Sequence, residues 1–341
     1  MPRPTAPDAA LLRVLAELDL GRGAEPLEVS PLTGGVSSDI WKVVFPDRTV
    51  CIKQALAKLR TEADWYAPVG RNAAEADWLR WAGRAVPGSA PALLAEDRGA
   101  GLLVMEYLAP DRYPLWKAEL MAGHVDAAFA ARVGETLGRL HAAAAADRAV
   151  PAGFPNATTF HDIRIEPYLL HPIERNRDLR GPLEALAGDL AGRAPTLIHG
   201  DASPKNLLRS PGGAPVFLDA ECATAGDPAF DLAFCLNHLL LKGRLFPARG
   251  TALLTSAAAL RGAYLRRVAG EEPAALETRV ARLLPGLMLG RVDGRSPVEY
   301  LDTEPLRAPV RAFARAHLIR PPATLPSLFA DWAGLLEEFN A

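Results

Sequence analysis

The pattern of apolar positions changes about a third of the way along the chain. Residues 26–56 contain short runs of β-branched and aromatic residues interrupted by Gly and Pro, which is typical of strands joined by turns. Residues 71–85 are rich in helix formers and are followed by Pro and Gly, which predicts a helix. Residues 91–108 predict two more strands around a Gly-containing turn. The expected order is therefore three strands, one helix and two strands.

Helical patterns dominate the second part of the chain. Within residues 126–145, four apolar side chains recur at helical spacing and predict one buried face: Phe129, Val133, Leu137 and Leu140. Two short apolar runs, "PTLIHGD" and "APVFLDAE", interrupt the helical part, and each leads into an Asp. The composition changes near residues 107–112, so we expect an N-terminal lobe of residues 1–108 and a C-terminal lobe of residues 109–341. The predicted fold class is α+β, with a small antiparallel sheet and one helix followed by a mostly helical lobe.

The amino-acid composition indicates which kinds of molecule the protein binds. The chain has 341 residues, of which 49% are hydrophobic and 23% charged, and its net charge is −2. This balance is that of a soluble globular protein and favours neither nucleic acid nor a membrane as a partner. Cys51, Cys222 and Cys235 lack the spacing of a zinc site or a disulfide framework. We find no apolar signal sequence or membrane span, and expect a cytoplasmic monomer or homodimer that acts on a small molecule.

The segment "LIHGDASPKNLL", residues 197–208, carries the most specific chemistry. Asp201 follows an apolar run, Asn206 comes five positions later, and Asp219 ends the next apolar run, "VFLD". Phosphoryl transfer requires a residue that positions the attacking hydroxyl, and oxygen ligands for Mg²⁺. Protein kinases use an Asp, an Asn five positions later and then a metal-binding Asp. The same spacing here predicts that these three side chains share one metal–phosphate site.

A lysine in the N-terminal half supplies a candidate cation for the phosphates of ATP. Lys53 lies inside an apolar strand, where a charge is costly unless it is paired or binds an anion. Glu75 in the following helix is its expected partner, an arrangement with which kinases hold the α- and β-phosphates. Glu62 is a rival partner, since it is nearer in sequence.

A glycine-containing turn precedes the second predicted strand, where a phosphate-covering loop is expected. Gly34 and Gly35 allow a close approach of the backbone to a ligand. Ser37 and Ser38 follow directly and offer hydrogen-bond donors. We therefore include Gly35, Ser37 and Ser38 among the candidate ATP-binding residues.

The last predicted strand of the N-terminal lobe, "LLVMEYL", is a candidate for adenine recognition. Met105 would be the gatekeeper beside the adenine pocket. The backbone of Glu106 and Leu108 would then contact adenine.

These pieces together carry a resemblance to a known family. The motifs are "GGVSSDIWKV", "CIKQAL", "VMEYL", "HGDASPKN", "LDAE" and "GDPAFDLA", which span residues 34–233. The chain resembles the aminoglycoside phosphotransferase and choline kinase family of the protein-kinase-like fold. The resemblance implies a bilobal fold, an ATP- and Mg²⁺-dependent kinase activity and an alcohol group as acceptor.

The resemblance also implies residue roles. Asp201 corresponds to the catalytic base, and Asn206 and Asp219 to ligands of Mg²⁺. Asp231 corresponds to a structural Asp that braces the catalytic loop. Glu221 resembles a second acidic residue of some branches, which reaches a metal directly or through water.

Departures from the protein kinases point to a small acceptor. The chain has no HRD, DFG or APE motif, and "LDAECATAGDPAFDLAF" leaves little room for an activation segment. We therefore expect a small hydroxylated acceptor that resembles a sugar, an amino alcohol or a hydroxy acid. One alternative is an aminoglycoside or related antibiotic kinase. Another is a nucleotide-binding pseudokinase that acts as a sensor, which the complete set of candidate catalytic residues disfavours.

Two polar segments of the C-terminal lobe are candidates for the acceptor site. Residues 290–301 form a dense polar cluster between helical stretches, and residues 160–172 form another. Arginines favour an anionic acceptor such as a carboxylate or phosphate, whereas a polycationic aminoglycoside would need a mainly acidic pocket. The candidate acceptor residues are Arg291, Asp293, Arg295, His161 and Arg164.

Overall fold

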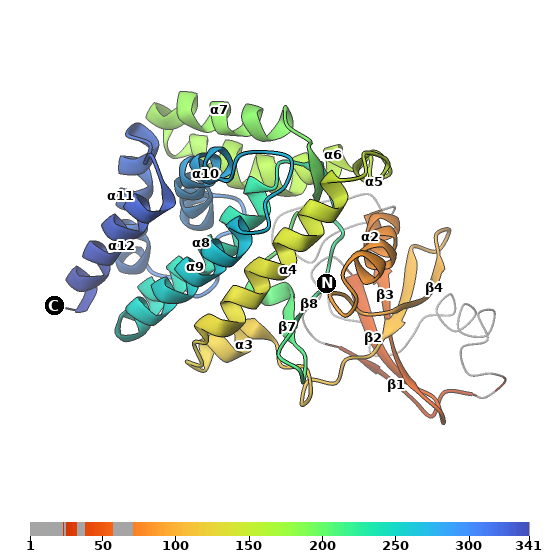
Figure 1. Ribbon diagram of the computed structural model, residues 1–341. Helices are drawn as coiled ribbons and strands as arrows, with labels where there is room; N and C mark the ends of the chain where they lie inside the picture. Colours follow the sequence, from red (N-terminus) through yellow and green to blue (C-terminus); the bar gives the residue numbers. More distant parts are fainter. Residues whose placement is uncertain (1–22, 24, 33–37, 57–70, 341) are drawn as a thin grey trace. The chain divides into compact units, whose positions relative to one another are not determined.

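The computed structural model describes residues 23, 25–32, 38–56 and 71–340 (Figure 1). The chain divides into two compact units, residues 1–112 and residues 113–341. The boundary expected from composition, after residue 108, lies four residues before this division. The predicted α+β class is confirmed.

The described part of the N-terminal unit contains an antiparallel sheet of five strands, in the spatial order β1-β2-β3-β5-β4. The predicted sequence of three strands, one helix and two strands is confirmed within the described residues. The elements are β1 (Glu28–Pro31), β2 (Ser38–Val44), β3 (Thr49–Ala55), α2 (Arg71–Ala85), β4 (Leu93–Asp97) and β5 (Leu102–Glu106).

Alternation along the strands gives this sheet two different faces. Trp41 of β2 pairs in register with Ile52 of β3, which pairs in turn with Val104 of β5, and all three are buried. Because successive side chains of a strand point to opposite faces, Lys53 lies on the other face. On that face Lys53 contacts Glu75 of α2.

The C-terminal unit is mostly helical, as predicted. Its longer helices are α4 (Ala127–Ala145), α7 (Arg180–Ala191), α8 (Ala229–Leu245), α9 (Gly250–Leu265), α10 (Pro273–Asp293), α11 (Glu304–Ile319) and α12 (Leu325–Asn340). Shorter ones are α3 (Trp116–Met121), α5 (Ala149–Ala152), α6 (Ala157–Phe160), the π-helix η1 (His161–Leu170), and the 3₁₀ turns η2 (His171–Glu174), η3 (Arg177–Leu179), η4 (Pro204–Asn206) and η5 (Pro247–Arg249).

Helix α8 is the centre of this unit. Every residue from Ala229 to Gly243 is buried, including the polar ones, and α9, α10, α11 and α12 all pack against α8. Beside it, α4 packs closely against α9 (Figure 1). The predicted buried face of α4 is confirmed, since each of its four apolar side chains is at most 2% exposed.

Two short antiparallel ribbons carry the predicted apolar runs. Strand β6 (Thr196–Ile198) pairs with β9 (Thr224–Gly226), and β7 (Leu207–Arg209) pairs with β8 (Pro215–Phe217). The runs "PTLI" and "APVF" therefore belong to different ribbons, which the loop of residues 199–206 connects.

The segment of residues 290–301 was expected to lie between helical stretches, and this is wrong for its first part. Helix α10 continues to Asp293, so Arg291 and Asp293 lie in its last turn. Apolar residues keep helical spacing through Val292, and the helix ends only where Gly294 becomes extended. The second polar segment, residues 160–172, is helical too and buries Ile163 and Leu169. No helix among the described residues combines the length and apolar character needed to cross a membrane.

Close packing of α4 on α9 gives a testable prediction. A Cβ atom added at Gly134 would lie 2.1 Å from the carbonyl oxygen of Leu260, so Gly134→Ala must push the helices apart. We expect it to lower the free energy of unfolding by about 1–3 kcal/mol, the usual cost of overpacking. Gly188→Ala in α7 is the control, because its Cβ would meet open space. The control should stabilise by about 0.5–1 kcal/mol. Urea unfolding of both variants is the measurement, and equal changes would contradict the packing described.

Candidate active site

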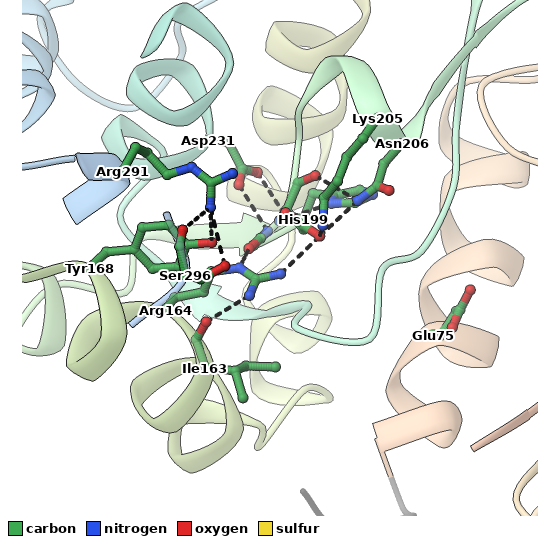
Figure 2. A network of polar contacts seen from close by, with 12 residues as sticks. Glu75, Ile163, Arg164, Tyr168, His199, Lys205, Asn206, Asp231, Arg291 and Ser296 are labelled. Atoms are coloured by element: carbon green, nitrogen blue, oxygen red, sulfur yellow. Dashed lines mark hydrogen bonds and ion pairs between the residues drawn. The ribbon is translucent and has the colours of Figure 1, made fainter. Parts of the chain in front are cut away.

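The loop that follows β6 places Asp201. Gly200 has φ +76°, and a Cβ there would lie 2.7 Å from both the Cβ and the carbonyl oxygen of Cys222. Only glycine satisfies both the left-handed backbone and the close approach. Asp231 of α8 holds the loop, since its carboxylate accepts hydrogen bonds from the backbone N–H of His199 at 2.6 Å and of Gly200 at 2.8 Å (Figure 2). The family resemblance implied that Asp231 braces the catalytic loop, and its contacts agree with that position.

Asp231 is itself held by a buried chain of hydrogen bonds. Its side chain is 0% exposed and lies 3.1 Å from Nε2 of His141, whose Nδ1 lies 2.7 Å from the hydroxyl of Tyr264. Burial by itself would raise the pKa of Asp231, but the hydrogen bonds from His141 and the loop backbone outweigh it and lower that pKa. Burial also raises the pKa of Tyr264, which keeps its hydroxyl as a donor. Three helices, α4, α8 and α9, thus fix the start of the loop.

Asp201 has two carboxylate oxygens in different environments. Oδ2 accepts from Nδ2 of Asn206 at 2.8 Å and lies 2.9 Å from both Arg164 and Lys205. Oδ1 is buried and has no hydrogen-bond partner within the part of the chain that the structure describes. Three donors therefore fix the carboxylate through one oxygen and leave the other for a ligand.

Arg164 connects η1 to this loop. Its Nε donates to the carbonyl oxygen of Gly200 and its NH1 to that of Ile163, both at 2.6 Å, and NH2 reaches Asp201 (Figure 2). Burial opposes the charge of Arg164, but the Asp201 carboxylate outweighs it and raises the pKa of Arg164. These contacts make Arg164 a partner of Asp201, and the acceptor role expected for it from the sequence stays a prediction.

Lys205 was missed by the sequence analysis. It lies four residues after Asp201, and its side chain is 46% exposed while Nζ contacts the carboxylate. A lysine inside the "HGDASPKN" motif was the available signal. The sequence does not show that Lys205 reaches Asp201, because the contact depends on the turn η4, which contains Lys205.

The β7–β8 ribbon brings the candidate metal ligands together. The carbonyl oxygen of Asn206 accepts from the backbone N–H of Leu218 at 2.9 Å, so Asn206 and Asp219 lie at the same end of the ribbon. Asp219 has φ 64°, a left-handed conformation that few residues other than glycine adopt and that is typical of functional sites. Glu221, two residues later, is buried.

The donor set at this end of the ribbon fits Mg²⁺. Nδ2 of Asn206 makes both of its hydrogen bonds to Asp201, which leaves the amide oxygen for a metal. An amide oxygen and the carboxylates of Asp219 and Glu221 are hard ligands of the kind Mg²⁺ takes, usually together with waters and phosphates. Among the described residues no group of three or more His, Cys, Asp or Glu side chains forms a metal site by itself.

In the N-terminal unit, Lys53 and Glu75 form the expected pair. Their Nζ and Oε2 atoms are 2.6 Å apart, and the side chains are 5% and 2% exposed. The rival partner Glu62 lies outside the described residues, as do Gly34, Gly35 and Ser37.

The other candidate ATP-binding residues lie on the sheet. Ser38 begins β2 and is buried, and Met105 in β5 is 7% exposed. The backbone N–H of Glu106 donates to the carbonyl of Ala92, so only its carbonyl remains for adenine. Leu108 follows β5. The ATP contacts of these residues stay predictions.

The expected acceptor residues of the C-terminal unit are not all brought together. Arg311 holds Asp293 through two hydrogen bonds, and Arg295 pairs with Glu166. His161 is exposed and contacts Asp162. Arg291, in contrast, is buried and donates to Tyr168 and Ser296 (Figure 2). An acceptor role stays a prediction for all four, and these contacts favour only Arg291.

Comparison with known proteins places the chain in a family. The model of the phosphotransferase enzyme family matches residues 28–270, well over half of the chain. The chain belongs to this family. The resemblance found in the motifs and the expected protein-kinase-like fold are thereby confirmed. No curated protein matches the sequence.

Solved structures of the family share this fold at low sequence identity. Macrolide 2'-phosphotransferase MphH from Brachybacterium faecium is 18% identical, with a TM-score of 0.53 over 92% of this chain and 98% of that one. Amicoumacin kinase hAmiN, in complex with AMP-PNP, Ca²⁺ and Ami, is 15% identical, with a TM-score of 0.55 over 92% and 94%. An aminoglycoside phosphotransferase from Alicyclobacillus acidocaldarius is 13% identical, with a TM-score of 0.51 over 99% and 98%.

The bracing of the loop by Asp231 can be tested without an activity assay. In Asp231→Asn an amide N–H₂ would face backbone donors, so the hydrogen bonds to His199 and Gly200 cannot both persist. We expect both backbone amides to lose protection against hydrogen exchange by tenfold or more, and stability to fall by about 1–3 kcal/mol. Asp227→Asn is the control, because Asp227 caps the same helix and pairs with Arg279 without contacting the loop. It should lose stability yet keep the two amides protected, and equal deprotection in both variants would contradict the bracing role.

Proposed function

We propose that this protein is an ATP- and Mg²⁺-dependent kinase that transfers the γ-phosphate to a hydroxyl of a small metabolite. The observation that carries the proposal is the environment of Asp201. Three donors hold Oδ2, while Oδ1 is buried with no hydrogen-bond partner among the described residues. A buried acceptor atom of this kind is suited to an incoming hydroxyl group. The AMP-PNP in the amicoumacin kinase complex supports a nucleotide as donor.

The proposed mechanism assigns one role to each group. Asp201 accepts the hydrogen of the acceptor hydroxyl through Oδ1 and takes the proton as the hydroxyl oxygen attacks the γ-phosphorus. The bond between the γ-phosphorus and the β–γ bridging oxygen breaks, and ADP leaves with its electron pair. Arg164 and Lys205 keep the carboxylate in place during attack. Mg²⁺, when held by Asn206, Asp219 and Glu221, would neutralise charge on the phosphates.

The N-terminal unit has a separate proposed role. Lys53, oriented by Glu75, would bind the α- and β-phosphates, as the lysine and glutamate of protein kinases do. A buried ion pair of this kind stabilises a fold little, because removing the two charges from water cancels much of their mutual attraction. Its retention in an apolar sheet is explained better by a phosphate ligand. Acceptor-dependent ADP release across a library of hydroxylated metabolites, with mass spectrometry of the product, tests the function as a whole.

The role of Asp201 leads to a prediction. Asp201→Asn keeps the shape of the side chain and removes its capacity to take a proton, so kcat should fall by roughly 10²–10⁴-fold. Nucleotide affinity should change little, because Asp201 does not contact the phosphates in this proposal. The control is Asp162→Asn, an exposed Asp on η1 that contacts only His161 among the described residues. Steady-state kinetics and nucleotide titration are the measurements. Near-normal turnover of the Asp201 variant would remove the base assignment.

The Lys53–Glu75 pair leads to a prediction about nucleotide affinity. Glu75→Gln removes the charge that orients the lysine ammonium, so the dissociation constant of ATP should rise about tenfold, equivalent to about 1.4 kcal/mol. Asp77→Asn, two residues later on the same helix, is the matched control, since Asp77 contacts surface arginines. Fluorescence or calorimetric titration with a non-hydrolysable ATP analogue measures the effect. Equal affinity in both variants would show that the pair does not serve the nucleotide.

A further inference from the structure

A group of buried basic and phenolic side chains lies in the C-terminal unit, outside the contacts of Asp201. It consists of Lys242 and His238 on α8, Arg291 on α10, and Tyr300 in the segment after α10. We call these four residues the basic cluster. Their exposed fractions are 1%, 5%, 7% and 9%, so each is at least nine-tenths buried.

The charges of the basic cluster lack anionic partners. No carboxylate of the described residues lies within 4.0 Å of Nζ of Lys242, whose one hydrogen bond, at 3.4 Å, is to the carbonyl of His238. Nζ also lies 4.8 Å from the centre of the Tyr300 ring. Arg291 donates only to neutral oxygens, at 3.0 Å to the hydroxyl of Tyr168 and at 2.6 Å to the carbonyl of Ser296. Arg291 is therefore a buried cation, and Lys242 a buried amine, without a carboxylate at close range, which is costly.

Hydrogen-bonding capacity in the basic cluster is also unused. Nε of Arg291, Nε2 of His238 and the hydroxyl of Tyr300 are buried and have no hydrogen-bond partner within the described part of the chain. A buried polar group without a partner costs about 1–3 kcal/mol, so three together call for an explanation. A ligand rich in acceptor oxygens would satisfy them.

The electrostatics of the basic cluster agree with this geometry. Burial, together with the charges of Lys117 and Arg291, lowers the pKa of Lys242 to about 7 against the opposing effect of Glu299. Burial, with Arg291 and Lys242, lowers the pKa of His238 well below its usual value. Glu299 offsets only part of this effect, because its carboxylate forms an ion pair with Lys117. The lowered pKa values mean that the protein supplies too little negative charge to keep Lys242 and His238 protonated, and a bound anion would favour their protonated forms.

The basic cluster adjoins the catalytic loop through aromatic contacts. The ring of Phe234 lies 5.2 Å from that of His238, 5.5 Å from that of Tyr168 and 5.9 Å from the guanidinium carbon of Arg164. Arg164 in turn contacts Asp201. Figure 2 shows Arg291, Tyr168 and Arg164 in one neighbourhood. An acceptor whose hydroxyl meets Asp201 could thus extend toward the basic cluster.

We propose that the basic cluster binds a carboxylate or phosphate group of the acceptor, so that the substrate is a small hydroxylated compound that carries an oxyanion. This inference rests on the proposed kinase function and specifies its acceptor. Oxyanions accept several hydrogen bonds and carry the charge that the basic cluster lacks. Water could fill the hydrogen bonds but would leave the charge uncompensated. Polycationic acceptors would be repelled.

Acceptor panels test the inference in the intact enzyme. Each panel contains three compounds that share one hydroxylated skeleton: a carboxylate, a phosphate monoester, and a neutral amide or alcohol. ADP release is measured with each compound. We expect at least tenfold higher kcat/KM for one of the two anionic members than for the neutral one, and which of them wins identifies the oxyanion. Preference for neutral or polycationic acceptors would overturn the inference and leave the kinase function standing.

Variants locate the effect. Lys242→Met keeps the aliphatic stem and removes a buried charge, so the fold should tolerate it. Tyr300→Phe removes only the hydroxyl. Both should raise the KM of the anionic acceptor, the first by tenfold or more, without changing the KM of ATP. Arg282→Met is the matched control, because Arg282 is an exposed cation on α10, the helix that carries Arg291. An acceptor KM that changes equally in the control and the cluster variants would overturn the inference.

Equilibrium binding separates this inference from the proposed function. Inorganic phosphate and lactate are titrated calorimetrically into the full chain, the Lys242→Met variant and the Arg282→Met variant, with the nucleotide site saturated by AMP-PNP. We expect one of the anions to bind at least tenfold more weakly to Lys242→Met alone. Such binding, combined with no phosphorylated product in the acceptor panels or the metabolite library with ATP, would refute the kinase function and support the anion site. Binding of neither anion, or binding equally strong in all three proteins, would refute the anion site.

Discussion

The hydrogen bonds from the backbone of His199 and Gly200 to Asp231 are the constraint on which the candidate active site depends. A carboxylate with 0% exposure is costly unless it is fully hydrogen-bonded, and Asp231 gains two backbone donors and His141. Because α8 is buried on all sides, the loop acquires the rigidity of the core of the C-terminal unit. Gly200 then turns the chain in the left-handed region, and Asp201 follows in a fixed direction.

Charge in the C-terminal unit is arranged in two ways. Around Asp201, two cations and an amide meet one carboxylate oxygen, so the negative charge of the carboxylate is compensated and the second oxygen remains for chemistry. In the basic cluster the positive charges meet neutral oxygens and aromatic rings instead. The first arrangement orients a carboxylate whose charge is compensated by its neighbours. The second keeps its charge for a ligand, and a fold tolerates this cost at a binding site more readily than in a core.

Sequence reasoning recovered the parts of the site whose signal is local. The spacing from Asp201 to Asn206 and the apolar run before Asp219 led to residues that the β7–β8 ribbon brings to one end. A lysine in an apolar strand led to Glu75, since only a partner or an anion makes such a position tolerable. The acceptor site was harder, because Asp293 and Arg295 are polar in the sequence yet contact Arg311 and Glu166. Polar composition does not reveal whether a charge is already paired.

The sequence by itself determined the order of strands and helix in the N-terminal unit, the buried face of α4, and the positions of Asp201 and Asn206 in one loop, because each depends on spacing along one segment. The tertiary structure decided which oxygen of Asp201 is held, by placing Arg164 of η1 beside a loop that begins 35 residues later. It also gathered Lys242, His238, Arg291 and Tyr300 from α8, α10 and the segment after it. Burial and pairing are properties of side chains that meet from distant segments, so no pattern within one segment specifies them.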